Sequence, residues 1–363
     1  MLLIHIYLKE LAMAALKSIV VVTLGLSLAG CLPPEIDTPP LNGKSLADEA
    51  NGTATCVPGT YAYAVGQSQT LPVEYAGECD VPGVEVTDDP EKLRLMKHIK
   101  HVSGYVTLMG TTDLATALPD LESCVAISVG TLSGPVLTSP KNLTKLDMLQ
   151  VNGSAIQTLS GFDNITALKA LKILNCPNLT TISGFSNLTT IVDLDLSANP
   201  KLTSANIFNK VTQIGNIAVV AKYLQFPDKN GNTIAATLPE LPNFPQLLKV
   251  TEGFNIANQP WTKINGFPLL QTTKSLTLTG MAKLNTLDFP QLTDVHVLFL
   301  SGMPLLTTLA GLPKVQVTQQ LTLCVSGVDC KEAANFGLEH AKAFQQKDWG
   351  SCNTNPPAPP CKQ

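Results

Sequence analysis

The sequence predicts a mainly β protein in which about eleven similar coils stack into a β-solenoid closed by a short C-terminal helix. Short strands of the apolar-x-apolar type recur along the chain, most of their intervals are 22 or 23 residues, and 44% of the residues are hydrophobic. Self-similarity at such a period is typical of one supersecondary unit that stacks on copies of itself and is buried by them. The strands are expected to begin at Val84, Val106, Val125, Leu149, Leu171, Leu194, Ile217, Phe254, Leu276, Leu298 and Leu321.

The clearest copy of the repeat begins at Leu171. Because side chains alternate along a strand, Leu171 and Ile173 share the face that points into the coil, while Lys172 points outward. Leu179 and Ile182 are then placed to close the other sides of the coil, and glycine, Asn-Pro and Cys-Pro steps supply its corners. A single coil cannot bury its own apolar edges, so each is stable only between neighbours.

The frame Leu168-x-x-Leu171-x-Ile173-x-x-Cys176-x-x-Leu179 is close to the leucine-rich repeat. That family places an asparagine in the turn position of nearly every coil, whereas residues of several types occupy it here. The phrases GFSNLTTI (184–191) and NPKLTS (199–204) are more similar to the receptor L-domain, and the resemblance covers roughly residues 79–325. It implies a right-handed β-solenoid with leucine-rich-like coils. The turn position holds Cys176, Asn199, Gln259, Met281 and Met303.

An apolar run over residues 18–30 follows Lys17 and ends at Cys31. Thirteen residues are too few to span a bilayer as a helix, which needs about 20, but they suit the core of a signal peptide. The segment Leu28-Ala29-Gly30-Cys31 resembles the bacterial lipoprotein signal, which implies cleavage before Cys31 and acylation of its thiol. A plain signal peptide with an incidental cysteine is the alternative.

These signals divide the chain into a lipoprotein signal peptide (1–30), a Pro-rich tether (31–55), the repeat solenoid (56–330) and a C-terminal cap and tail (331–363). The expected partner at the N-terminal end is a membrane, contacted through lipid on Cys31. Leu32 follows the cysteine in place of an acidic residue, which favours the outer membrane or cell surface of a bacterial envelope.

Charge argues against a nucleic-acid partner. Without residues 1–30 the chain has 22 basic and 27 acidic residues, a net charge of −5, and Arg94 is the single arginine of the whole sequence. Arginine is the usual reader of phosphate, so nucleic acid is not an expected ligand.

Eight cysteines remain besides Cys31, and an exported chain can oxidise them. Cys124 and Cys176 are expected to lie about two coils apart, roughly 10 Å, beyond the ~7 Å limit of a disulfide, so both are predicted to be buried free thiols. The Cys324-x5-Cys330 spacing does not fit a zinc site, and no metal is predicted. The candidate disulfide cysteines are Cys56 and Cys79 at the start of the solenoid and Cys324, Cys330, Cys352 and Cys361 at its end.

One interval, from Ile217 to Phe254, is 37 residues long and predicts an insertion over residues 221–244. Insertions in repeat proteins form loops that often carry function, so Tyr223 and Phe226 are candidate binding residues. A neutral surface loop is the alternative.

Two short helices are expected at the ends of the solenoid. Residues 91–101 suggest a helical turn between the first two strands, and residues 331–347 suggest a capping helix. The side chains expected to face the last coil from this cap are Phe336, Leu338, Ala341 and Phe344.

The outward strand positions form a row of mild polarity across the coils, and a charge pair between Lys172 and Asp195 is expected on adjacent strands. Phe299 is either an exposed aromatic in this row or is covered by the C-terminal cap. The candidate ligand-contacting residues of the row are Gln150, Lys172, Asp195, Asn255, Thr277 and Phe299, and its other members are expected to be Glu85, Thr107, Ala126, Ala218 and Thr322.

The sequence contains no G-x-S-x-G, G-x-G-x-x-G, Walker or H-E-x-x-H motif, so neither catalysis nor a cofactor is predicted. No pair of carboxylates suited to acid/base chemistry is visible on the outward row. The predicted function is therefore a non-enzymatic, lipid-anchored surface protein that binds or adheres to a protein or glycan ligand. A structural envelope protein without a specific ligand and a carbohydrate-active β-solenoid enzyme are the alternatives.

Overall fold

The computed structural model describes residues 80–349 except for 82, 133, 204–206, 221, 224–234, 240 and 342–346. All of these residues belong to one compact unit, residues 49–363. The signal segment, the tether and five of the cysteine positions, Cys31, Cys56, Cys79, Cys352 and Cys361, lie outside the described residues.

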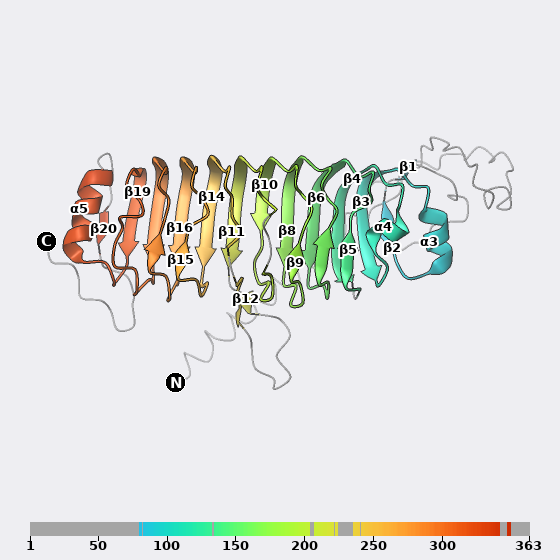
Figure 1. Cartoon of the computed structure of the whole chain (residues 1–363), viewed down its shortest axis with the longest axis horizontal. Coiled ribbons are helices and arrows are strands. Elements are labelled where there is room, and N and C mark those ends of the chain that lie inside the picture. Colours follow the sequence, from blue (N-terminus) through green and yellow to red (C-terminus); the bar gives the residue numbers. More distant parts are fainter. Residues whose placement is uncertain are drawn as a thin grey trace, which may run out of the picture. The chain divides into compact units, whose positions relative to one another are not determined.

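The described chain is a mainly β protein that forms a parallel β-solenoid, as the periodicity predicts, with about ten turns where about eleven were expected (Figure 1). A 13-stranded sheet forms one side, with β2 and β1 both paired to β3 and every further strand added in chain order. Its strands are β1 (Asp80–Val81), β2 (Val84–Val86), β3 (His101–Gly110), β4 (Ser123–Leu132), β6 (Lys145–Asn152), β8 (Ala167–Leu174), β10 (Thr190–Asp195), β11 (Gln213–Val220), β14 (Lys249–Ala257), β16 (Thr272–Thr279), β18 (Asp294–Ser301), β19 (Gln316–Cys324) and β20 (Lys347–Trp349).

Shorter strands line another side of the coils and also pair in parallel. One group has three strands and the other has two. They are β5 (Val136–Thr138), β7 (Thr158–Ser160) and β9 (Thr181–Ile182), and then β15 (Lys263–Ile264) with β17 (Thr286–Leu287).

The strand register confirms that nearly all of the expected apolar positions are equivalent, although most of the strands begin four or five residues earlier than expected. From β6 to β19, Leu149, Leu171, Leu194, Ile217, Phe254, Leu276, Leu298 and Leu321 occupy equivalent positions. The start at Val125 was wrong, because Val106 pairs with Ile127. Ile127 and Val129 are the buried apolar pair of β4 and pair with Leu149 and Val151 of β6, while Val125 is 41% exposed.

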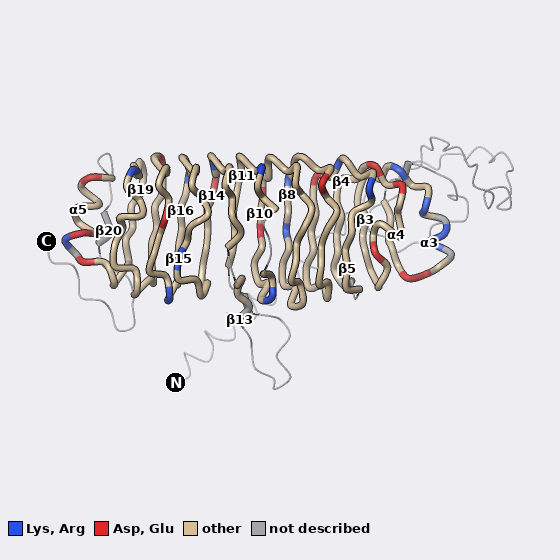
Figure 2. The backbone as a smooth tube through the Cα atoms, viewed as in Figure 1, with Lys and Arg blue, Asp and Glu red and all other residues tan. Residues whose placement is uncertain are grey.

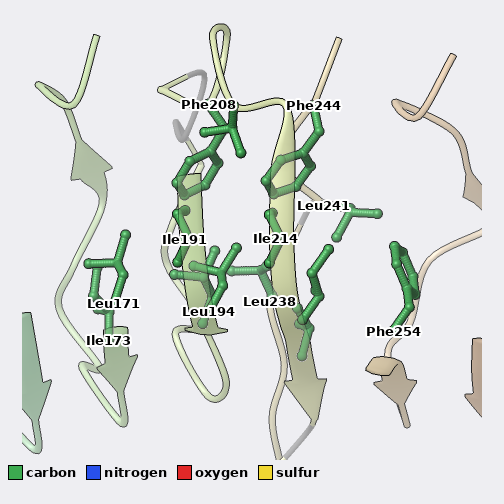
Figure 3. Close-up of a cluster of buried hydrophobic side chains, with 14 of the residues drawn as sticks. Leu171, Ile173, Ile191, Leu194, Phe208, Ile214, Leu238, Leu241, Phe244 and Phe254 are labelled. Carbon is green, nitrogen blue, oxygen red and sulfur yellow. The ribbon is translucent and has the colours of Figure 1, made fainter. Parts of the chain in front are cut away.

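A column of phenylalanine rings runs along the inside of the coils. Phe162 stacks on Phe185 at 5.0 Å between ring centroids, and Phe208 stacks on Phe244 at 4.8 Å. Phe267 continues the column, 5.4 Å from Phe244. All these rings are buried, and Figure 3 shows Phe208 and Phe244 side by side among aliphatic core residues. Stacked pairs of this kind add to the hydrophobic energy of burial.

The mixed residues of the turn position are all buried, and Asn199 and Met281 bond backbone groups of the turns in different ways. The Asn199 amide donates to the Ile173 and Leu196 carbonyls, both at 2.8 Å, and accepts from the Cys176 N–H at 3.1 Å. The Met281 sulfur accepts from the Gln259 N–H at 3.4 Å. A strict asparagine ladder is therefore unnecessary here.

The chain between β2 and β3 forms helix α3 (Pro90–Met96), which agrees with the helical turn expected there. A one-turn helix, α4 (Leu114–Ala117), follows β3.

Helix α5 (Cys330–His340) covers the last coil, but it is shorter than expected. It ends at His340, and Lys347–Trp349 forms β20, which pairs with β19. Phe336 and Ala341 are buried as expected, whereas Leu338 is 63% exposed. Residues two apart on a helix do not share a face, so Leu338 cannot face the core together with Phe336. Phe344 lies outside the described residues.

The insertion contains a short antiparallel hairpin of β12 (Lys222–Tyr223) and β13 (Ala235–Ala236). It projects from the edge of the solenoid where β11 ends (Figure 1). The chain has returned to the core by Leu238, which is fully buried and whose carbonyl accepts from the Trp261 indole N–H at 2.7 Å. The insertion thus ends earlier than the expected residue 244. Phe226 and the side chain of Tyr223 lie outside the described part.

Candidate binding surface

The sheet brings the candidate ligand-contacting residues into one line across its outward face. Gln150 pairs with Lys172, Lys172 with Asp195, and the line continues through Ala218 to Asn255, Thr277 and Phe299. We call this line the outer row; its members are Glu85, Thr107, Ser128, Gln150, Lys172, Asp195, Ala218, Asn255, Thr277, Phe299 and Thr322.

One expected member was wrong. Ala126 is in line with Tyr105 and Met148, where it is 2% exposed, and Ser128 takes its expected place in the outer row. The six candidate residues keep their places, from β6 to β18. At ~4.8 Å between neighbouring strands they span roughly 30 Å.

Phe299 is the aromatic residue of the row. It lies between Thr277 on β16 and Thr322 on β19, and its side chain is half-buried. Thr322 pairs onward with Asp348 of β20, so the C-terminal strand extends the sheet beyond Phe299. Because β20 lies beside β19 within the sheet, it does not cover the outward face at Phe299, whose side chain stays partly exposed to solvent.

The expected pair between Lys172 and Asp195 is replaced by a diagonal one. Lys172 Nζ lies 2.7 Å from Asp193 Oδ2. Asp195 faces Lys172 in the register, but its carboxylate accepts hydrogen bonds from the backbone N–H (2.9 Å) and the hydroxyl of Ser197. The short aspartate is held by the turn that follows its strand, and the longer lysine reaches the other carboxylate.

Further charge pairs join neighbouring strands of the same sheet. Lys169 lies 2.8 Å from Asp147, and Lys274 lies 2.7 Å from Glu252. Exposed pairs contribute little to stability, but they cancel the local field. Along the tube in Figure 2, charged residues are scattered among many uncharged ones. The face therefore offers hydrogen bonds and modest apolar area in place of a strong charge.

Among the described residues, the two carboxyl groups with shifted pKa values, Asp88 and Asp113, lie away from the outer row. Hydrogen bonds from Thr112 and Thr111 lower the pKa of Asp88, the Thr112 hydroxyl contributing most. Burial raises the pKa of Asp113, and the Thr138 N–H, which donates to it at 2.6 Å, opposes that shift. Both residues link neighbouring coils near the N-terminal end of the described chain.

Cys124 and Cys176 are free and buried, as predicted. Burial raises the pKa of Cys124 to about 12 and that of Cys176 to about 11, so neither thiol is a nucleophile near neutral pH. Cys324 is disulfide-bonded, while the pairings within its group and that of Cys56 with Cys79 remain predictions.

Within residues 80–349, as far as they are described, no group of three or more His, Cys, Asp or Glu side chains could hold a metal ion. The helices of that same part are all too short or too polar to cross a membrane.

A groove with a volume of about 570 Å³ lies outside the outer row and was not predicted. The phenylalanine column gives the sequence signal for it, because asparagine, aspartate, glycine and proline flank its rings. The groove residues are Asn209, Asn243, Pro245, Asn265, Gly266, Pro268 and Asp288.

No family model, curated protein or solved structure matches this chain. The assignment to the parallel β-solenoids therefore rests on the strand register itself.

Proposed function

We propose that this protein is a lipid-anchored surface protein that binds or adheres to a protein or glycan ligand through the outer row. The observation that carries the proposal is the register, which lines up polar side chains and one aromatic from successive coils along roughly 30 Å. Ion pairs such as that of Lys172 with Asp193 leave the face locally neutral, which suits hydrogen bonding to an uncharged partner.

The anchor is proposed from the sequence. Leu28-Ala29-Gly30-Cys31 supports lipid attachment at Cys31, and Leu32 supports the outer membrane or surface of a bacterial envelope. The phrases over 184–191 and 199–204 support a likeness of the coils to the receptor L-domain. In cells fed a labelled fatty acid, Cys31→Ala should lose the label that the unaltered chain carries, and a variant that keeps it would rule out this anchor.

Binding is tested with the full chain in a zwitterionic detergent, on a glycan array and in adhesion to immobilised matrix proteins. The variant replaces Gln150, Asn255 and Phe299 by alanine. A matched control replaces the exposed Asn142, Gln246 and Leu305, which lie outside the main sheet. The proposal expects the control to bind like the unaltered chain and the outer-row variant to lose binding.

Equal binding by the two variants would show that the outer row is not the contact surface. A chain that binds nothing in either assay, although it is lipidated and exported, would favour a structural spacer. The evenly stacked coils would suit that role as well.

A further inference from the structure

The groove beside the phenylalanine column has features of a second ligand site. Its residues lie in the turns that lead into β11, β14, β16 and β18, whereas the outer row lies within those strands. We infer that this groove binds a neutral sugar residue of a glycan, through Asn243, Asn265 and Asp288 and against Pro245 and Pro268.

The stacked rings set the positions of the groove residues. Phe244 and Phe267 are 5.4 Å apart, and Phe267 and Phe289 are 5.6 Å apart, so the residues that precede them lie on successive coils. Those residues are Asn243, Gly266 and Asp288. An amide and a carboxylate thus flank a position with no side chain.

Gly266 keeps this position open. Its φ of +105° is in the left-handed region, and a Cβ built on it would lie 2.6 Å from Asn243 Oδ1. A larger residue would be strained and would displace the amide. The hollow between Asn243 and Asp288 therefore follows from a backbone conformation that favours glycine.

The residues that follow the rings form an apolar surface. Pro245 and Pro268 come directly after Phe244 and Phe267, and proline has no N–H to offer. The groove consequently combines a flat aliphatic side with polar side chains. A pyranose has the same two-sided character, with C–H groups on its faces and hydroxyls around its rim.

The hydrogen-bonding groups also fit a sugar. Each amide offers two donors and an acceptor, and the Asp288 carboxylate accepts from several hydroxyls at once. The groove residues include no lysine, arginine or histidine, which argues against phosphate or another anion. They also include just one carboxylate, fewer than a cation site would use. A volume of about 570 Å³ lies within the range of small-ligand pockets.

The test is saturation-transfer NMR on the full chain in zwitterionic detergent. The probes are the methyl glycosides of glucose, galactose, mannose and N-acetylglucosamine, each at millimolar concentration. At least one glycoside should receive saturation, with and without EDTA. Asp288→Ala and Asn243→Ala should each weaken its binding about tenfold, because each removes hydrogen bonds to the ligand.

Asn142→Ala is the matched control, since it removes an exposed asparagine on a distant coil and should leave binding unchanged. The triple outer-row variant should bind these single-residue glycosides normally even though it loses the larger ligand of the outer row, which separates the two sites. If Asp288→Ala unfolds, Asp288→Asn keeps the size of the side chain and still removes the charged acceptor. The inference is overturned if no glycoside receives saturation, if a folded Asn243/Asp288 double variant binds normally, or if EDTA abolishes binding.

Discussion

Single side chains decide whether the polar backbone inside a coil is satisfied. Asn199 is fully buried and serves three backbone groups, two carbonyls and one N–H. The sequence marked its position as a turn but could not show that neighbouring coils would solve the same problem with a thiol, a longer amide or a thioether. Those solutions depend on contacts between coils, which periodicity does not reveal.

Asn199→Ala should destabilise the protein by about 2–4 kcal/mol, because it leaves the Cys176 N–H and the Ile173 and Leu196 carbonyls buried without this partner. Urea unfolding followed by circular dichroism measures the change. Asn178→Ala is the control: its amide is half-buried and accepts one bond from Lys201, so its effect should stay within about 0.5 kcal/mol. Equal losses in both variants would contradict this role.

Asp88 should make the first coils sensitive to acid. Its carboxylate accepts from the Thr111 N–H at 2.8 Å and the Thr112 N–H at 2.9 Å, and these bonds favour the charged form. Because the pKa of Asp88 is lower in the folded chain, its stabilisation is present above the unfolded pKa of about 4 and is lost as the pH falls through the folded value.

Amide hydrogen exchange tests the direction of this pH dependence. Protection factors of Thr111 and Thr112 should be high at neutral pH and decrease below about pH 4. In Asp88→Ala, the Thr111 and Thr112 amides should lack this protection both at neutral pH and below about pH 4. Protection that is independent of pH in the unaltered chain would refute the prediction.

At the scale of elements, helix α5 takes the place of the coil that would follow the last one. At the C-terminal end Asp329 caps α5 by accepting from the N–H groups of Lys331 and Glu332. Glu332 then accepts from the Leu309 N–H at 2.7 Å and from the Thr308 hydroxyl at 2.8 Å. The side chain of the cap thus supplies an acceptor that a further coil would have supplied from its backbone.

Glu332→Ala should therefore open the last coil, with a cost of about 1–3 kcal/mol for the unpaired N–H and hydroxyl. Faster hydrogen exchange of the Leu309 amide is the direct readout. Glu339→Ala removes a carboxylate of the same helix that is 72% exposed, and it should change that exchange rate little. An unchanged Leu309 amide in Glu332→Ala would mean that the helix covers the coil by apolar contact alone.

For the whole molecule, the period of 22 or 23 residues predicts the fold class and all but one position of the outer row. The displaced position, Ala126, follows from two overlapping apolar pairs in β4, Val125 with Ile127 and Ile127 with Val129, between which spacing alone does not decide. The Lys172 pairing was wrong because Asp195 also has a local partner in Ser197. The groove was missed because its hollow depends on the positive φ of Gly266 and on its closeness to Asn243 of the neighbouring coil, which the sequence alone does not show.

The phenylalanine column should act as a shared support of the central coils. Phe267 is fully buried and contacts the rings of Phe244, Phe254 and Phe289. Phe267→Ala should cost about 3–5 kcal/mol, and the loss should spread to both neighbouring coils. Urea unfolding measures the loss of unfolding free energy, and hydrogen exchange of β14 and β18 shows whether both neighbouring coils are affected.

Leu269→Ala provides the control for this substitution. That side chain is 38% exposed on the same coil, so its removal should have a much smaller effect. If Phe267→Ala changed exchange in its own coil alone, the coils would be independent of one another.

The parallel stacking also has a mechanical consequence. Because the strands of the 13-stranded sheet bond to their neighbours along the stacking direction, tension between the two ends of the sheet pulls its hydrogen bonds open one row at a time and does not shear them together. Each coil that peels away turns a rise of ~4.8 Å into 22 or 23 residues of extended chain, about 75 Å long. A solenoid held at one end and pulled at the other would therefore lengthen in steps of one coil under load, while its remaining coils stay folded.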